Sequence, residues 1–230
     1  MKTVGIIGGV GPETTSEFYS ELILQCQNLN NTNRPPILIY SIPLPYDVEE
    51  DAIVRGMGEE RYVPLLTEAA QKLEKAGADF LVMPCNTLHV FIEDIRNSVN
   101  IPALSIVEET TKFLKEKNIS NIGVLSTEIT LKKKIYESYF LKNNIKQVLP
   151  DNHQQKKIGE IIYNLVMNKH SNKDKEELIE IINTFKEKGL KNILLACTDL
   201  QLITPQDLEI KIYDTMKIFA DATVREILKD

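Results

Sequence analysis

Short apolar runs alternate with longer amphipathic stretches throughout this 230-residue chain. The apolar runs predict buried strands, because each is only a few residues long. Between the runs, apolar residues recur at helical spacing, as Phe18, Leu22 and Cys26 do. This alternation predicts an α/β fold in which parallel sheets are flanked by helices. The strands are expected at residues 3–7, 37–42, 80–83, 101–106, 121–127, 145–149, 192–196 and 210–214.

The same pattern occurs twice along the chain. A first strand that contains a glycine, Gly5 or Gly123, is followed some 75–80 residues later by a strand that ends in a cysteine, Cys85 or Cys197. We therefore expect two similar lobes, related by pseudo-symmetry, with the two thiols facing each other across a cleft. The expected boundaries are residues 1–106 plus 210–230 for the first lobe and 107–209 for the second.

Composition and charge exclude several classes of function. The net charge of -6 argues against nucleic acid as a partner. No apolar run is long enough to cross a bilayer, and the glycine-broken start does not resemble a signal peptide. The three cysteines and three histidines are too scattered for a disulfide framework or a metal site. A cytoplasmic location is expected, since free thiols persist there.

Cys85 and Cys197 are each expected at the C-terminal end of a strand, where open α/β sheets bind ligands. At Cys85 a following helix N-terminus would favour the thiolate. For a single cysteine, burial in the core is the simpler interpretation. Two cysteines in matching positions favour function. Cys26 lies on the apolar face of a helix and is interpreted as structural.

Two opposed thiols suit proton transfer at a carbon acid without a cofactor. One thiolate removes a proton and the opposite thiol returns one to the other face. Fixed donors must hold the substrate carboxylate, and four residues at strand–helix junctions can supply them: Asn86, Thr87, Thr127 and Thr198. His89 lies four residues after Cys85, which leaves a Cys–His hydrolase as an alternative, although a core or capping histidine is favoured.

Two further segments offer groups that could bind a substrate carboxylate. The glycine run that includes Gly9 lacks the G-x-G-x-x-G spacing of a dinucleotide loop, but its backbone N–H groups can bind an anion. The polar stretch 46–62 is expected to be an irregular loop at the edge of the sheet that can act as a lid or a substrate clamp. It carries Arg55 and Arg61, which either bind a carboxylate or form surface ion pairs with Glu49, Glu50 or Glu59.

At these residues the chain resembles the aspartate/glutamate racemase family. The resemblance rests on four segments spread over most of the chain: Gly8-Gly9-Val10-Gly11-Pro12, Met83-Pro84-Cys85-Asn86-Thr87-Leu88-His89, Ser126-Thr127 and Ala196-Cys197-Thr198-Asp199. It implies a cofactor-independent racemase of aspartate, with glutamate next, that is usually a homodimer. It also implies that Cys85 and Cys197 are the acid/base pair, and that the Asn and Thr residues above hold the carboxylate and amine of an amino acid.

The resemblance further implies that Lys157 contacts the side-chain carboxylate of the substrate. The chain departs from the family pattern at three places. Ala196 and Asp199 stand where the family often has Gly and Glu, Phe219 stands where it often has His, and Arg55 is the nearest candidate for its substrate-binding arginine.

Two alternatives remain open from the sequence. One is an enzyme of the same fold that uses a single thiol, such as a maleate-type isomerase or a decarboxylase. The other is a catalytically silent module that binds amino acids. The presence of both cysteines disfavours each of them.

Overall fold

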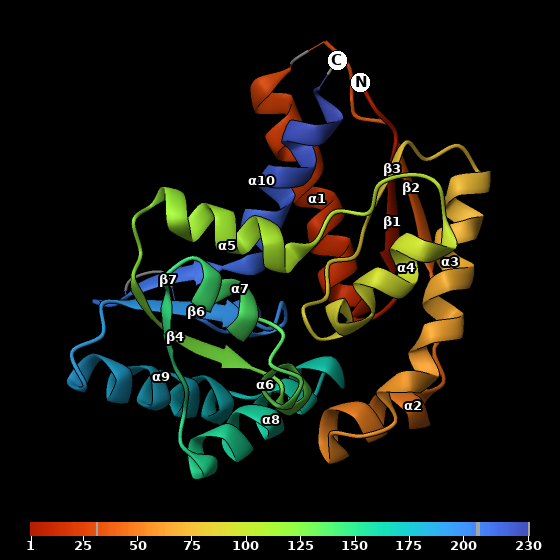
Figure 1. Ribbon diagram of the computed structural model, residues 1–230. Helices are drawn as coiled ribbons and strands as arrows, with labels where there is room; N and C mark the ends of the chain where they lie inside the picture. The colour runs from red at the N-terminus through yellow and green to blue at the C-terminus, as the bar shows by residue number, and fades with distance from the viewer. Residues whose placement is uncertain (31, 206–207, 230) are drawn as a thin grey trace.

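Two parallel sheets form the framework of the molecule (Figure 1). The computed structural model describes residues 1–30, 32–205 and 208–229, except for the side chains of residues 54 and 55. The first sheet has the strand order β2-β1-β3 and the second β5-β4-β6-β7. The strands are β1 (Val4–Gly8), β2 (Ile37–Ser41), β3 (Phe80–Val82), β4 (Asn121–Ser126), β5 (Lys146–Val148), β6 (Asn192–Ala196) and β7 (Lys211–Asp214).

The two sheets repeat one arrangement, which confirms the predicted α/β fold with two lobes. In each, the first strand of the lobe lies between the next strand and the strand that precedes the cysteine. The central strands also share a glycine that allows close packing. A Cβ at Gly5 would lie 2.8 Å from Leu81 Cδ2, and one at Gly123 would lie 2.5 Å from Ile193 Cδ1. Both glycines are therefore needed for packing against the neighbouring cysteine-bearing strand.

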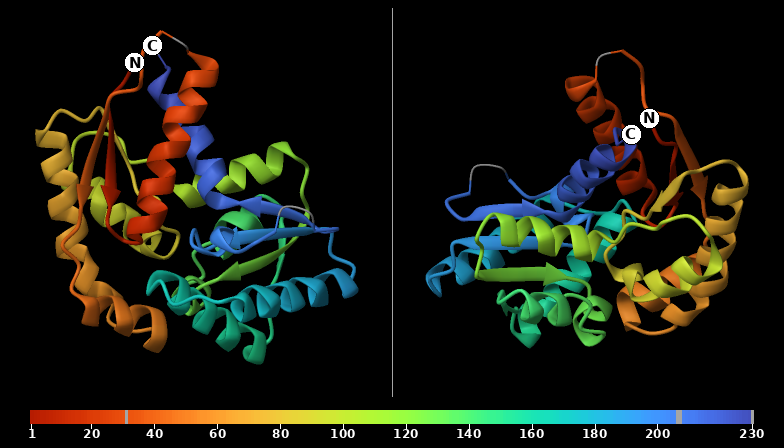
Figure 2. Two further views of the ribbon diagram at one scale, coloured as in Figure 1. Left: turned by 180° about the vertical axis from the view of Figure 1, so that it is seen from behind. Right: turned by 45° about the horizontal axis from the view of Figure 1, so that its top comes forward.

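Three helices, α1, α5 and α10, lie between the lobes. Figure 2 shows α1 and α10 packed side by side. Phe18 of α1 stacks on Phe219 of α10, with ring centroids 5.7 Å apart. The largest apolar core joins these helices and α5 to both β1 and β4. The α-helices are α1 (Pro12–Leu29), α2 (Tyr46–Glu50), α3 (Val63–Lys75), α4 (Ile92–Ser98), α5 (Ile106–Glu116), α6 (Glu128–Lys132), α7 (Glu137–Lys142), α8 (Asn152–Val166), α9 (Asn172–Glu187) and α10 (Thr215–Ile227).

The remaining helical segments are short. The π-helical segment η1 (Asp51–Arg55) continues directly from α2. Three 3₁₀ turns complete the set: η2 (Glu59–Tyr62), η3 (Thr87–Phe91) and η4 (Leu200–Leu202). Among the described residues, the helices are all too short or too polar to cross a membrane.

Three expectations differ from the structure. Strand β7 pairs with β6 in the second sheet, so residues 210–230 do not all join the first lobe. The other lobe boundaries stay a prediction. The strand expected at 101–106 is reduced to one bridge between Leu81 and Ala103, because α5 begins at Ile106. The segment 46–62 is helical rather than irregular, since its apolar positions Val48, Ala52 and Tyr62 pack into the core of the first lobe.

Candidate active site

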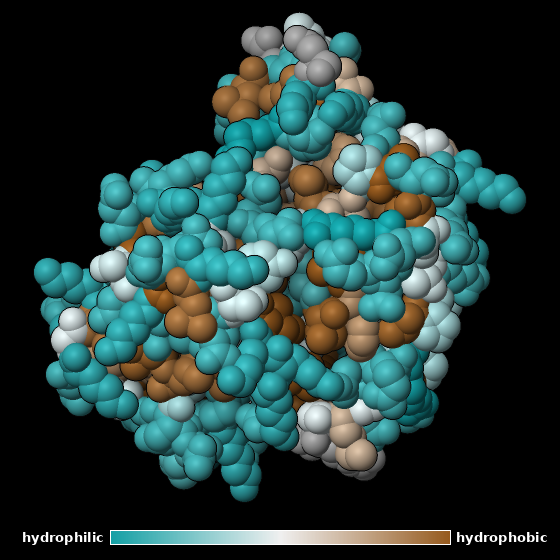
Figure 3. Space-filling model, in the orientation of Figure 1, coloured by the Kyte–Doolittle hydropathy of each residue, from teal (hydrophilic) through white to brown (hydrophobic). Residues whose placement is uncertain are grey.

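Cys85 and Cys197 line one cavity between the lobes. Cys85 follows β3 after Met83 and Pro84, and Cys197 follows β6 directly. Cys85 is half-buried, Cys197 is only 5% exposed, and both are free thiols. The cavity has a volume of about 60 Å³. Figure 3 shows apolar side chains gathered where the lobes meet.

The backbone N–H groups of Leu88 and Thr87, at the start of η3, lower the pKa of the Cys85 thiol, as expected of a helix N-terminus. Burial acts in the opposite direction and, together with the charges of Asp199 and Glu49, raises the pKa of Cys85 to about 12. The expected thiolate is therefore not the resting form, because desolvation and two carboxylates outweigh the local dipole.

The Cys197 thiol has a carboxylate as its partner. Its Sγ donates to Oδ2 of Asp199 at 3.5 Å, and the other carboxylate oxygen accepts from Thr14 Oγ1 at 2.8 Å. Burial and the charge of Asp199 raise the pKa of Cys197 well above its usual range. Burial also raises the pKa of Asp199, although its two hydrogen bonds oppose this. The pair can thus exchange a proton between sulfur and oxygen.

Three threonine hydroxyls meet at one side of the cavity. Oγ1 of Thr87 lies 2.9 Å from Oγ1 of Thr127 and 3.3 Å from that of Thr130, which itself lies 3.0 Å from Thr127 Oγ1. Thr87 comes from the first lobe and the other two from the start of α6 in the second. Thr87 and Thr127 line the cavity. Hydroxyls that rotate freely can donate to a carboxylate placed here.

Asn86 and Thr198 also line the cavity, but much of their bonding capacity is used inside the protein. Asn86 is 1% exposed, donates to Thr215 Oγ1 at 2.9 Å and accepts from the hydroxyl of Tyr136. Thr198 Oγ1 donates to the carbonyl of Pro84 at 3.3 Å. The bonds between Asn86 and Tyr136 and between Thr198 and Pro84 cross between the lobes and fix the strand ends that carry the two thiols.

His89 is a core histidine and not the partner of a catalytic thiol. Its Nδ1 lies 2.7 Å from the carbonyl of Cys85, and its Nε2 accepts from the backbone N–H of Ile106 at 3.0 Å. The ring is therefore the neutral tautomer with the proton on Nδ1, and burial lowers its pKa to about 4. With both nitrogens bonded to backbone, the imidazole cannot act as a base for the Cys85 sulfur.

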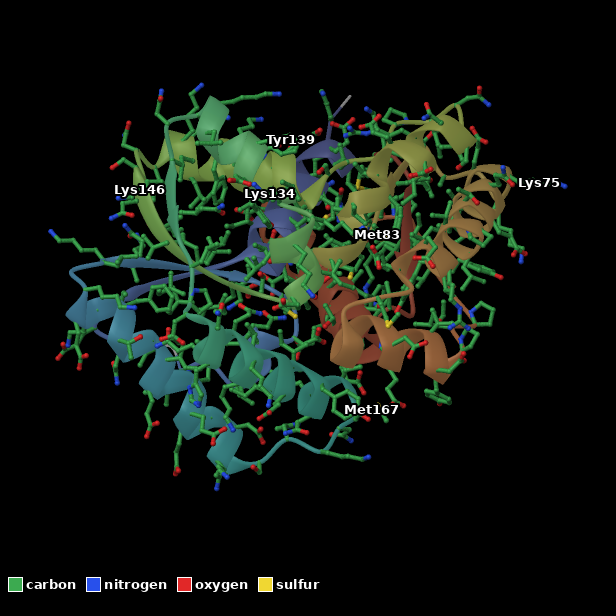
Figure 4. The ribbon with its side chains drawn as sticks, turned by 60° about the horizontal axis from the view of Figure 1, so that its bottom comes forward. Lys75, Met83, Lys134, Tyr139, Lys146 and Met167 are labelled. Atoms are coloured by element: carbon green, nitrogen blue, oxygen red, sulfur yellow. The ribbon has the colours of Figure 1, made fainter. Side chains whose placement is uncertain are left out.

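The α2–η1 segment covers the cavity from the first lobe. Glu49, Ala52 and Ile53 line the cavity here, with Tyr62 behind them. η1 packs against α8 and α6 of the second lobe. Figure 4 shows from below how α2 and α8 approach each other, with Met167 marking the C-terminal end of α8. The position is that of the predicted lid.

Several expected substrate-binding residues lie elsewhere. The N–H of Gly9 donates to Thr15 Oγ1 at 3.1 Å, and Val10 and Gly11 line the cavity in its place.

Lys157 does not line the cavity and pairs with Glu160 at 3.0 Å and Glu177 at 3.3 Å. Arg61 pairs with Asp47 at 2.7 Å, which is a surface ion pair. Arg55 ends η1, and its side chain lies outside the described residues.

The sequence pattern did not predict Glu49 as a cavity residue and indicated only a surface partner for arginine. The i, i+3, i+4 spacing of Glu49, Ala52 and Ile53 was an available signal, because these positions share one helical face. It was hidden by the surrounding acidic residues. Within the described residues, no group of three or more His, Cys, Asp or Glu side chains could hold a metal ion.

Several known proteins resemble this chain in sequence and in fold. Broad specificity amino-acid racemase RacX of Bacillus subtilis is 33% identical over 230 residues, which cover 98% of each chain. The aspartate racemase of Picrophilus torridus superposes with a TM-score of 0.83 at 26% identity, over 100% of this chain and 96% of that one. An aspartate racemase homologue from Pyrococcus horikoshii gives 0.80 at 25% identity over both whole chains. A family model described as Asp/Glu/hydantoin racemase matches residues 7–223. This chain therefore belongs to the Asp/Glu/hydantoin racemase family.

Proposed function

We propose that this protein is an amino-acid racemase that inverts the α-carbon by proton transfer with two thiols, Cys85 and Cys197. The observation that carries the proposal is that these thiols come from opposite lobes and line the same small cavity. Each thiol also has a group that can assist its ionisation. Backbone N–H groups lower the pKa of Cys85, and the Asp199 carboxylate can accept the proton of Cys197.

The reaction needs one thiolate and one thiol. The thiolate takes the α-proton from one face, and the electron pair left on Cα spreads into the substrate carboxylate as an enediolate. The opposite S–H then gives its proton to the other face of Cα and becomes the thiolate. The hydroxyls of Thr87 and Thr127 are placed to donate to the developing enediolate oxygens.

Substrate binding can generate the thiolate. In the free protein, the charges of Asp199 and Glu49 add to burial in raising the pKa of Cys85. A substrate ammonium beside these carboxylates offsets their charge, so the thiol pKa falls when the substrate is bound. Asp199 can then accept the proton of Cys197 through their existing hydrogen bond. The resting thiols are thereby protected from unwanted chemistry.

The proposal is tested by Cys85→Ser and Cys197→Ser in heavy water, with loss of the α-proton followed by NMR and inversion by chiral chromatography. Each variant should lose racemisation, since a hydroxyl is a far weaker acid than a thiol. Each should still exchange the α-proton of one enantiomer, with opposite preferences. Cys26→Ala, in the core and outside the cavity, is the matched control and should racemise normally. Near wild-type racemisation by either serine variant would favour a one-thiol isomerase instead.

Aspartate, with glutamate next, remains the sequence-based prediction for the substrate. It requires a cation opposite the side-chain carboxylate. Among the cavity side chains that the structure describes, none is a lysine or arginine, and Lys157 is paired elsewhere. Arg55 remains the sequence-based candidate for this cation. The homodimer implied by the family resemblance and the cytoplasmic location expected for free thiols also stay predictions.

A further inference from the structure

The charged side chains that line the cavity, within the described part of the chain, are two carboxylates, Glu49 and Asp199. Both are close to the reacting groups, because each contributes to the raised pKa of Cys85. Glu49 also raises the pKa of Tyr62, which lines the same cavity. The substrate therefore meets a surface that favours positive charge.

Asp199 already has partners inside the protein. Thr14 and Cys197 donate to its two oxygens. Since it lies beside a thiol that acts at Cα, the substrate group nearest to it is the α-ammonium. Asp199 thus pairs with one positive charge of the substrate, the α-ammonium.

Glu49 differs from Asp199. Its carboxylate forms no hydrogen bond or ion pair with another described residue. It is half-buried, and burial is the largest cause of its raised pKa, followed by the charges of Asp199 and Glu13. Its neighbour Asp47 pairs with Arg61 on the outside of the segment. A desolvated carboxylate without a cation is unfavourable, and a cationic ligand relieves that cost.

The walls near Glu49 suit an aliphatic chain. Ile53, on the same helical face, lines the cavity together with Ile162 and Val166 of α8. A methylene stem packs on such side chains while its charged end reaches a polar group. A second substrate carboxylate would instead add a third negative charge beside Glu49 and Asp199.

We propose that Glu49 determines specificity, and that it selects an amino acid with a cationic aliphatic side chain, of the lysine or ornithine type. The α-ammonium lies towards Asp199, the α-carboxylate towards Thr87 and Thr127, and the side-chain ammonium at Glu49. This inference rests on the proposed racemase function and names the substrate class of the same cavity.

The test compares α-proton exchange in heavy water for lysine, norleucine and aspartate with the whole protein. Norleucine has the straight aliphatic chain of lysine but no side-chain ammonium. Lysine should be used with a KM at least tenfold lower than that of norleucine, and aspartate should be the poorest of the three. Glu49→Gln should raise the KM for lysine by about tenfold to hundredfold, as expected for loss of a charged hydrogen bond. The KM for norleucine should change less than about threefold.

Glu60→Gln is the matched control, since it removes the same charge from an exposed residue of η2 that does not line the cavity. It should leave all three KM values unchanged. Aspartate as the best substrate, or equal effects of Glu49→Gln on lysine and norleucine, would overturn the inference while racemisation stands. No exchange with any of a full set of amino acids would instead overturn the proposed function.

Discussion

The Cys197 thiol donates to Asp199 at 3.5 Å, whereas the pKa of Cys85, its counterpart in the other lobe, is lowered by backbone N–H groups. The pseudo-symmetric framework therefore places two thiols in chemically different surroundings. A carboxylate can take a proton from sulfur, and backbone N–H groups can only stabilise the sulfur once it is charged. This asymmetry makes Asp199 the positioning residue for one half of the reaction.

Asp199→Asn should lower kcat/KM by about 10²-fold or more, in the range typical of lost acid–base assistance. The fall must be equal in both directions, because the equilibrium constant between enantiomers is 1. Since the charge of Asp199 raises the pKa of Cys197, the variant should also alkylate at Cys197 at lower pH. Initial rates from each enantiomer and alkylation against pH measure the two effects. Asp199→Glu, which keeps the charge, should retain activity within about tenfold of wild type and the original alkylation profile.

The free protein should resist alkylation near neutral pH. Burial raises the pKa of all three thiols, and that of Cys85 is about 12. Cys85 should react first because it is half-buried, and Cys26, in the core, should react last. Peptide mapping by mass spectrometry after iodoacetamide treatment between pH 7 and about 9 would establish the order. Reaction of Cys85 at pH 7 as fast as a free thiol would contradict the protonated resting state.

Lys157→Ala should leave KM and kcat unchanged for every substrate, acidic ones included. Its ammonium pairs with Glu160 of α8 and Glu177 of α9. These side chains keep contact with solvent, and ion pairs near the surface contribute about 1 kcal/mol or less, so stability should also change little. Steady-state kinetics with aspartate and lysine would check this. A selective rise in KM for aspartate would restore Lys157 as a substrate contact.

The positions of the two cysteines could be predicted from the sequence, because strand, glycine and thiol recur in the same order in both lobes. The place of Lys157 could not. It precedes the cavity residue Ile162 by five positions, which is about 140° around the helix, so its side chain leaves the cavity face. The family resemblance pointed to α8, which does line the cavity, but it could not give the rotation of α8 relative to the sheet.

The charges that line the cavity also could not be predicted from the sequence. Glu49 lies in a run of acidic residues that looks fully solvated, and only packing of η1 against α8 turns one of them inward. Likewise, the favourable helix terminus at Cys85 could be predicted, but burial and two nearby carboxylates decide the pKa. Desolvation depends on residues far apart in the chain, which local patterns do not report.

Gly123→Ala should destabilise the protein by about 1–3 kcal/mol, the usual cost of overpacking. A Cβ there would lie 2.5 Å from Ile193 Cδ1 and 2.8 Å from Phe185 Cδ1. Gly159→Ala is the control, since a Cβ on this α8 residue meets nothing within 4 Å. It should stabilise the helix by about 0.5–1 kcal/mol. Urea unfolding of both variants would measure the difference, and equal stabilities would contradict the packing argument.

Acid should weaken the fold through His89. Burial lowers its pKa to about 4 in the folded protein, against 6.5 for the ordinary group. Between these values the unfolded chain binds more protons, so the stabilising contribution is complete above about pH 6.5 and is lost as pH falls towards 4. The loss amounts to about 3 kcal/mol at most.

The measurement is urea unfolding at pH values from 7 down to about 4.5. His89→Gln should be less stable at pH 7, because the bonds to Cys85 and Ile106 are disturbed, and its stability should fall less steeply with acid. His170→Gln, at an exposed position, should follow the wild-type curve. If His89→Gln and wild type lost stability in parallel with acid, the acid sensitivity would arise from other groups. The neutral His89 ring that joins the backbone of Cys85 and Ile106 would then not control it.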